Sequence, residues 1–150
     1  FEALDSINAL LTKIDEVPAS LVLAQSANES GWGTSRFAIE ARNMFGIWCF
    51  REGCGIKPLQ RAAGKKYEVA KYETIQASVE AYMLNINSHP AYRELRRIRS
   101  EARADNSYLS GMALAEGLET YSARGEDYVE EIKQLIRINK LHRFNSEDKA

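Results

Sequence analysis

The sequence has no long apolar run and almost no excess of charge of either sign. No stretch approaches the roughly 20 apolar residues that a membrane-spanning helix needs, and the formal net charge is −1. The composition therefore argues against a general attraction to nucleic acid or anionic lipid. No signal-like segment follows Phe1, so no targeting signal can be read. With 150 residues, 45% of them hydrophobic, the chain is long enough to bury a core, and we expect residues 1–150 to form one domain.

Cysteine is scarce, and its two copies stand close together. Cys49 and Cys54 flank a short segment that includes Gly53. They can close a disulfide, which would indicate an oxidising compartment, or remain a pair of reduced loop thiols. Zinc is disfavoured because His89 and His142 are far away in the sequence and belong to no ligand-like cluster. We predict a Cys49–Cys54 disulfide, with no metal and no cofactor.

Helical spacing of apolar residues covers most of the chain. An amphipathic stripe near the start, ending near Pro18, is formed by Leu4, Ile7, Leu11 and Ile14. Pro18 suits the first turn of a second helix, rich in small and aliphatic residues, which we predict to be buried and to end at Gly31–Gly33. Further helices are predicted over 34–42, from Ile75 to Ile86, after Pro90, over 108–120 and over 127–141.

The helical spacing stops between Asn43 and Tyr72, where glycines interrupt short apolar stretches. We interpret residues 47–72 as a small β-hairpin lobe. The residues from Ser146 to Ala150 are typical of a frayed tail. The predicted fold class is mainly α, an α+β helical domain with one small β-lobe.

Glu29 is the strongest candidate for chemistry. It falls at the C-terminal end of the predicted small-residue helix, where the helix dipole opposes a negative charge. Partial burial beside Trp32 would act in the same direction, and we expect both effects to raise the pKa of Glu29. A carboxylic acid that stays protonated near neutral pH can protonate a glycosidic oxygen. Taken alone, a solvated glutamate at a helix end is the simpler interpretation.

The residues around Glu29 belong to a longer pattern. The string Ala24-Gln-Ser-Ala-Asn-Glu-Ser-Gly-Trp-Gly-Thr-Ser-Arg-Phe-Ala38 is followed by Asn43-Met-Phe-Gly-Ile-Trp48. It resembles the signature of glycoside hydrolase family 73, in which an alanine-rich helix ends in Glu-Ser-Gly-Trp-Gly and Asn-Leu-Phe-Gly-Ile follows. The bacterial Bax-type glucosaminidases share further segments, from about Val17 to Ile136: the Trp-Cys-Phe and Gly-Cys-Gly run, Asn85 to Arg96, and Tyr121 to Tyr128.

The resemblance implies a lysozyme-like fold and an endo-β-N-acetylglucosaminidase with Glu29 as its general acid. The implied substrate is the β-1,4 bond between N-acetylglucosamine and N-acetylmuramic acid in peptidoglycan glycan strands. The implied location is periplasmic or extracellular, at the bacterial cell wall, with no nucleic-acid partner. A muramidase or a lytic transglycosylase would need the same single acid and remains an alternative, as does a glycan-binding module without turnover.

The second catalytic group is open. Many relatives carry a second glutamate on the β-lobe, whereas the corresponding stretch Gly55–Ala63 contains no acid. Glu68 is the preferred candidate because it lies in the predicted returning strand, with Glu52 and Glu73 as the nearest others; a solvated charge is the alternative for each. Attack by the 2-acetamido oxygen of the substrate would need no second carboxylate.

Aromatic residues supply the remaining candidates. Tyr121 matches a family tyrosine near the scissile sugar, where its hydroxyl would bond the acetamido group or the attacking water, although its spacing to Tyr128 is one residue longer than in the commoner form. A core aromatic is the alternative for Tyr121, and packing is the alternative for Phe45 and for one tryptophan. The predicted substrate-binding residues are Trp32, Asn43, Phe45, Trp48 and Tyr128.

One predicted helix is locally basic. Its arginines are Arg93, Arg96, Arg97, Arg99 and Arg103. They would contact peptide carboxylates of the cell wall or, with less support, nucleic-acid phosphates. Because Glu94 and Glu101 dilute the charge, a solvated and salt-bridged helix face is the preferred interpretation.

Overall fold

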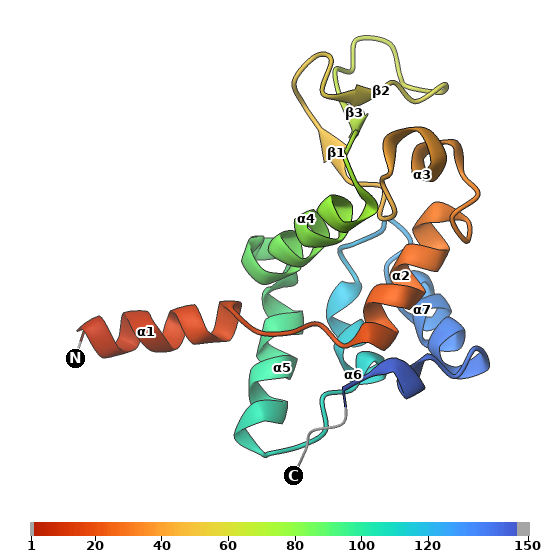
Figure 1. The fold of residues 1–150 in the computed structure, drawn as a ribbon. Helices are drawn as coiled ribbons and strands as arrows, with labels where there is room; N and C mark the ends of the chain where they lie inside the picture. The colour runs from red at the N-terminus through yellow and green to blue at the C-terminus, as the bar shows by residue number, and fades with distance from the viewer. Residues whose placement is uncertain (1, 147–150) are drawn as a thin grey trace. The chain divides into compact units, whose positions relative to one another are not determined.

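The computed structural model describes residues 2–146, whose helices and strands are drawn in Figure 1. By their contacts, these residues divide into two compact units. One unit joins the chain up to Ala24 with the chain from Leu84 onward, and the other is Gln25–Met83. Two helices, α2 (Ala19–Ser30) and α4 (Ile75–Ser88), run from one unit into the other. No helix among the described residues has the length and apolar character to cross a membrane. The predicted single domain stays a prediction.

The mainly helical fold with one small β excursion is confirmed. The unit that holds both chain ends contains α1 (Glu2–Lys13), the 3₁₀ turn η1 (Pro90–Tyr92), α5 (Arg93–Ala104), α6 (Gly111–Ala115), η2 (Glu116–Leu118), α7 (Glu126–Ile138) and η3 (Leu141–Phe144). Its core is built from the fully buried Leu95, Leu114, Leu118, Ile132 and Ile136. In place of the helix predicted over 108–120 the structure has the shorter α6 followed by η2. The predicted tail lies outside the described residues from residue 147 onward.

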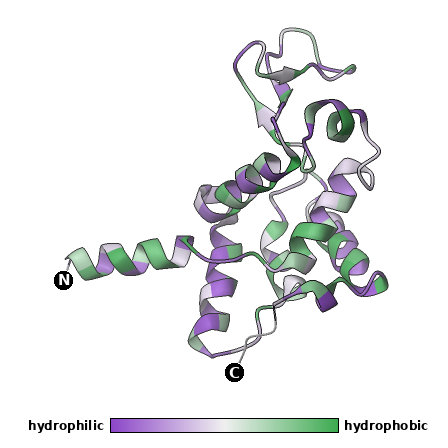
Figure 2. Cartoon of the chain, viewed as in Figure 1, coloured by the Kyte–Doolittle hydropathy of each residue, from purple (hydrophilic) through white to green (hydrophobic). Residues whose placement is uncertain are grey.

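Helix α1 differs from the other helices of its unit because none of its residues is buried. The predicted apolar stripe is present, but its side chains are 54–66% exposed: Leu4, Ile7, Leu11 and Ile14. Figure 2 shows hydrophobic and hydrophilic residues alternating along α1. The helix ends at Lys13, before the predicted boundary near Pro18. The amphipathic pattern thus identified the helix correctly, although the helix does not contribute a buried face.

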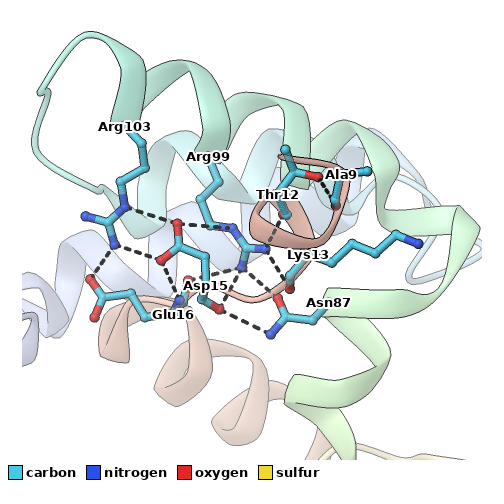
Figure 3. Close-up of polar contacts among 8 residues, drawn as sticks. All are labelled: Ala9, Thr12, Lys13, Asp15, Glu16, Asn87, Arg99 and Arg103. Carbon is cyan, nitrogen blue, oxygen red and sulfur yellow. Dashed lines mark hydrogen bonds and ion pairs between the residues drawn. The ribbon is translucent and has the colours of Figure 1, made fainter. Parts of the chain in front are cut away.

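The segment after α1 is held by a buried arginine (Figure 3). Arg99 is completely buried, and its guanidinium donates to the carbonyl oxygens of Thr12, Asp15 and Glu16, each at 3.1 Å. It also donates to Asn87 Oδ1 at 2.7 Å. The interpretation of this helix as a solvated face is therefore wrong for Arg99, because the guanidinium satisfies carbonyl groups that no regular element pairs. It is also wrong for Arg96, which is buried.

Asp15 completes this arrangement. Arg103 donates to both Asp15 oxygens at 3.1 and 3.0 Å. Partial burial raises the pKa of Asp15, but the hydrogen bonds from Arg103 and from the Glu16 backbone, together with the charges of Arg103 and Arg99, outweigh it and hold that pKa below its ordinary value. Asp15 is therefore ionised in the folded chain, and its negative charge offsets the positive charges of Arg99 and Arg103 in the second half of α5.

The second unit contains helix α3 (Arg36–Ala41) and a sheet of three very short strands, β1 (Trp48–Cys49), β2 (Gly55–Ile56) and β3 (Glu68–Ala70). The strand order is β1-β3-β2, and both outer strands run antiparallel to β3. Because β1 and β2 pair with β3 and not with each other, the lobe is a three-stranded sheet rather than a simple hairpin. Gly55 is required in β2, since a Cβ there would lie 1.9 Å from the carbonyl oxygen of Val69.

Candidate functional site

Helix α2 ends in a tight turn that determines the surroundings of Glu29. The three residues Gly31–Gly33 all have left-handed φ angles, between +56° and +78°. The backbone N–H of Trp32 donates to the Ala27 carbonyl at 2.8 Å, and the Ser30 hydroxyl accepts the Gly33 N–H at 2.8 Å. A left-handed tryptophan is uncommon, and here it leaves the Trp32 side chain 62% exposed. Backbone strain of this kind is often found at functional sites.

Glu29 lies in the last turn of α2, two residues before Gly31, and is partly exposed. Its Oε2 atom faces the backbone of Gly46, because a Cβ added there would lie 3.6 Å from Oε2. Gly46 itself has a φ of +66°, which any residue with a side chain rarely adopts. The Glu29 carboxyl therefore has a glycine backbone at its side, where a larger residue would crowd it. Sequence reasoning treated Gly46 only as one of the glycines that interrupt the apolar stretches after Asn43, and its place between Phe45 and Ile47 in the family string was the signal for a larger role.

Asn43 fixes the loop that carries Gly46. Its amide nitrogen donates to the carbonyls of Ile47 and Ala70 at 2.9 Å, and its Oδ1 accepts from the N–H groups of Phe45 and Ile47 at 3.2 Å. The side chain is only 1% exposed. These contacts support an internal role, in which Asn43 ties the loop beside Glu29 to strand β3. Its predicted direct contact with substrate stays a prediction.

The two tryptophans of the predicted binding set are both exposed. Trp48 is 54% exposed, and one face of its indole stacks on Tyr67 with ring centroids 4.3 Å apart. An aromatic ring backed in this way offers its other side to a flat, apolar ligand surface such as a sugar face. Sequence reasoning did not select Tyr67, which directly precedes β3 and is brought beside Trp48 by the pairing of β1 with β3.

Two other predicted binding residues are buried. Phe45 is 2% exposed and stacks on Tyr82 at 4.2 Å, while the Tyr82 hydroxyl donates to Gln25 Oε1. Tyr128 is 1% exposed. The contacts of both favour packing, and direct binding of a glycan by either one stays a prediction.

Tyr121 belongs to the unit that holds both chain ends. Its ring stacks on Tyr128 with centroids 5.6 Å apart and packs at a tilt against Tyr92 at 5.9 Å. The side chain is partly exposed, whereas Tyr92 and Tyr128 are buried. Tyr121 is thus held by two aromatic neighbours, one of which, Tyr92, sequence reasoning did not select.

Glu68 is buried, so the alternative interpretation of a solvated charge on the lobe does not apply to it. It is 1% exposed, and its two oxygens accept the backbone N–H groups of Gly55 at 2.9 Å and Gly53 at 3.3 Å. These two hydrogen bonds lower the pKa of Glu68 from its ordinary value. Glu68 therefore stays ionised and holds the loop between β1 and β2. Its catalytic role stays a prediction, and these contacts favour a structural one.

The predicted disulfide closes the same loop. Cys49 and Cys54 are joined, with Cα atoms 6.3 Å apart. Among the described residues, one group has the spacing of metal ligands, namely Cys49, Cys54 and Glu68. Since both sulfur atoms are used in the disulfide, this group is not a metal centre.

The three carboxylates considered for the second catalytic role line two different cavities of the described residues. Glu52 and Glu68 line a cavity of about 570 Å³ on the lobe together with Lys57 and Lys71. Glu73 lines another, of about 540 Å³, beside Met44. Neither cavity brings all three candidates together.

Comparisons with known proteins give the chain its family. The sequence model of the glucosaminidase family, described as mannosyl-glycoprotein endo-beta-N-acetylglucosaminidase, matches residues 6–141. Protein bax of Escherichia coli (strain K12) is 36% identical over 121 residues, which make up 81% of this chain and 42% of that protein. The chain therefore spans less than half the length of this relative. The catalytic domain of the autolysin Auto from Listeria monocytogenes has a similar fold, with a TM-score of 0.63, 21% identity, and coverage of 93% of this chain and 82% of that one. The chain belongs to the glucosaminidase family of glycoside hydrolases.

Proposed function

We propose that this chain is an endo-β-N-acetylglucosaminidase that cleaves the β-1,4 bond between N-acetylglucosamine and N-acetylmuramic acid in peptidoglycan. The observation that carries the proposal is the position of the partly exposed Glu29, at the strained end of α2 and beside Gly46, in a chain that belongs to this family. The fold similarity to an autolysin supports the cell wall as substrate. The corresponding location is periplasmic or extracellular.

In the proposed reaction Glu29 acts as general acid. Its proton passes to the oxygen between the two sugars while the bond from that oxygen to C1 of N-acetylglucosamine breaks. The N-acetylmuramic acid leaves with a free 4-hydroxyl group. A water oxygen adds to C1, its proton returns to a base, and the product strand ends in a reducing N-acetylglucosamine.

The group that assists at C1 is either a second carboxylate or the substrate itself. Glu68 is held inside the lobe by Gly53 and Gly55, which makes an attack on a sugar carbon unfavourable because two hydrogen bonds would have to break. These contacts favour the substrate-assisted course, in which the 2-acetamido oxygen attacks C1. Glu52 and Glu73, both exposed, remain the other carboxylates to test.

Tyr121 and the exposed tryptophans are the proposed substrate contacts. The hydroxyl of Tyr121 would hydrogen-bond the acetamido group or the water, and its packing between Tyr92 and Tyr128 would hold the ring in one orientation. Trp32 and Trp48 would stack on sugar rings. A Tyr121→Phe substitution isolates the hydroxyl because it keeps the aromatic packing.

Product analysis tests the proposal. Purified peptidoglycan is digested, the new reducing ends are reduced with borohydride, and the sugar alcohols are identified by mass spectrometry, with Glu29→Gln as the blank. Reduced N-acetylglucosamine is expected. Reduced N-acetylmuramic acid would instead identify a muramidase, and an anhydro sugar a lytic transglycosylase. Binding to glycan strands without any product would show a module that has lost turnover.

A further inference from the structure

Another cavity lies in the unit that holds both chain ends, between α1 and α5. It has a volume of about 510 Å³, and the charged residues that line it are Lys13, Arg93, Arg96, Arg97 and Glu101. Four cations and one carboxylate therefore surround the same space. The charge of the whole chain is close to zero, so this concentration of positive charge is local.

Most of this positive charge has no acidic partner. Arg97 is paired with Glu94 and Glu101. Lys13, Arg93 and Arg96 form no ion pair with any carboxylate in the part of the chain that the structure describes. In Figure 3 the Lys13 side chain points away from Asp15, and only its backbone carbonyl contacts Arg99. The Asp15 carboxylate thus serves the other end of α5.

Arg96 is the unusual member of this set. It is only 7% exposed, and its Nη1 donates to the carbonyls of Ile86 at 2.8 Å and His89 at 2.9 Å. These bonds orient the guanidinium but bring no negative charge. Burial, and then the nearby charge of Arg93, lower the pKa of Arg96 from its ordinary value. Buried charges are normally paired, so the buried guanidinium of Arg96, beside an open cavity and the like charge of the exposed Arg93, favours an anion from outside the chain.

We propose that this cavity binds a carboxylate of the peptidoglycan stem peptide, with Arg96 and Arg93 as its guanidinium partners and Lys13 as a third cation. The planar guanidinium fork matches a carboxylate in a bidentate geometry. The stem peptide is the part of peptidoglycan that carries several carboxylates, and the inference therefore rests on the proposed function. The site would select strands that still carry peptides over bare glycan.

Binding of the isolated stem tetrapeptide tests this site without any sugar. Calorimetric titration uses the tetrapeptide, the same peptide with its carboxylates amidated, and inorganic phosphate. The wild type is expected to bind the tetrapeptide. Its affinity should fall by roughly tenfold in Arg93→Ala, and by roughly a further tenfold in the double variant that combines Arg93→Ala with Lys13→Ala. Both residues are exposed, so these variants should keep the fold. The matched control is Arg137→Ala, an exposed arginine on α7 outside the cavity, which should bind like the wild type.

Several outcomes would overturn the proposal. Equal affinity for the amidated peptide, or an unchanged affinity in both variants, would show that no carboxylate is recognised here. Tighter binding of phosphate than of the tetrapeptide would indicate a phosphate ligand instead. The proposed function is tested separately by the product analysis, since a chain can bind the tetrapeptide without cleaving glycan, or cleave glycan without binding the tetrapeptide.

Discussion

Glu29 and Glu68 belong to the same compact unit, yet the fold uses them in opposite ways. Glu68 is buried, and both of its oxygens accept backbone N–H groups, which keeps the group ionised and fixed. Glu29 stands partly exposed at a helix end, against the bare backbone of Gly46. A carboxylate can thus hold a loop in place, or it can meet a substrate, and surroundings rather than residue type decide which.

The largest expected effect is a difference in hydrolytic activity between variants of Glu29 and variants of Glu68. Glu29→Gln should lower peptidoglycan hydrolysis by a factor on the order of 10² to 10⁴, because an amide cannot donate the proton to the leaving oxygen. Its melting temperature should stay near that of the wild type, since Glu29 lies at a partly exposed helix end. Glu68→Gln should reduce the rate much less. Equal losses in both variants, measured in folded protein, would show that the two carboxylates act as a catalytic pair.

The next effect concerns the loop that carries Gly46. Asn43→Ala removes a buried amide with four hydrogen bonds to backbone groups. Leaving these groups unpaired should lower the free energy of unfolding by roughly 2–4 kcal/mol, measured by urea denaturation. Asn28→Ala is the control in the same unit, because that side chain makes no hydrogen bond with a described residue. Similar stabilities of the two variants would contradict the role assigned to Asn43.

The contribution of Glu68 to stability should depend on pH. Its native pKa is lowered by the N–H groups of Gly55 and Gly53, so its stabilising effect is present above the ordinary glutamate pKa of about 4.3 and is lost as the pH falls through the native value. The wild type should therefore unfold at a higher temperature than Glu68→Gln at pH 7, and the difference should shrink toward pH 3. Asp15, which belongs to the other unit, also has a lowered native pKa. Its protonation at low pH should therefore destabilise the fold as well.

A comparison with Asp15→Asn separates these two acid effects. Each variant should lose its own part of the pH dependence and keep the other. If the difference between wild type and Glu68→Gln stays constant from pH 7 to pH 3, the ionised form of Glu68 is not what holds the loop.

Much of this arrangement follows from the local sequence. The boundaries of α2 were predictable because small residues form the helix and two glycines end it, and the same string placed Glu29 at the helix end. The disulfide followed from the short spacing of Cys49 and Cys54, and the structure confirms it. Such features depend on residues within about one turn of each other, where propensity and spacing are most informative.

Features that depend on residues far apart in the sequence were not predictable in this way. Arg99 lies only two residues from the exposed Arg97 on the same helix, and its packing against the segment before α2 explains its burial. The stripe of α1 has the pattern of a buried helix face but is exposed. The support of Trp48 by Tyr67 needed the strand register. Periodicity indicates which residues share a face and does not say what covers that face.

The smallest expected effect concerns the disulfide and its overlap with Glu68. The Cys49–Cys54 bridge closes a short loop, so the chain-entropy model assigns it at most about 2 kcal/mol. The carboxylate of Glu68 holds the same loop through Gly53 and Gly55. Reduction should therefore lower the melting temperature of the wild type only slightly. We expect a larger proportional loss of activity, because reduction loosens the lobe locally.

A double-mutant comparison shows whether the two restraints support each other. Reduction, or replacement of both cysteines by serine, should destabilise Glu68→Gln more than the wild type, because the loop then has neither restraint. Thiol titration of unfolded, unreduced protein should find no free thiol. Two titratable thiols in protein isolated without reductant would show that the disulfide is not formed, and the argument for an oxidising compartment would then fail. Additive effects of reduction and Glu68→Gln would show that the carboxylate and the disulfide restrain different parts of the lobe.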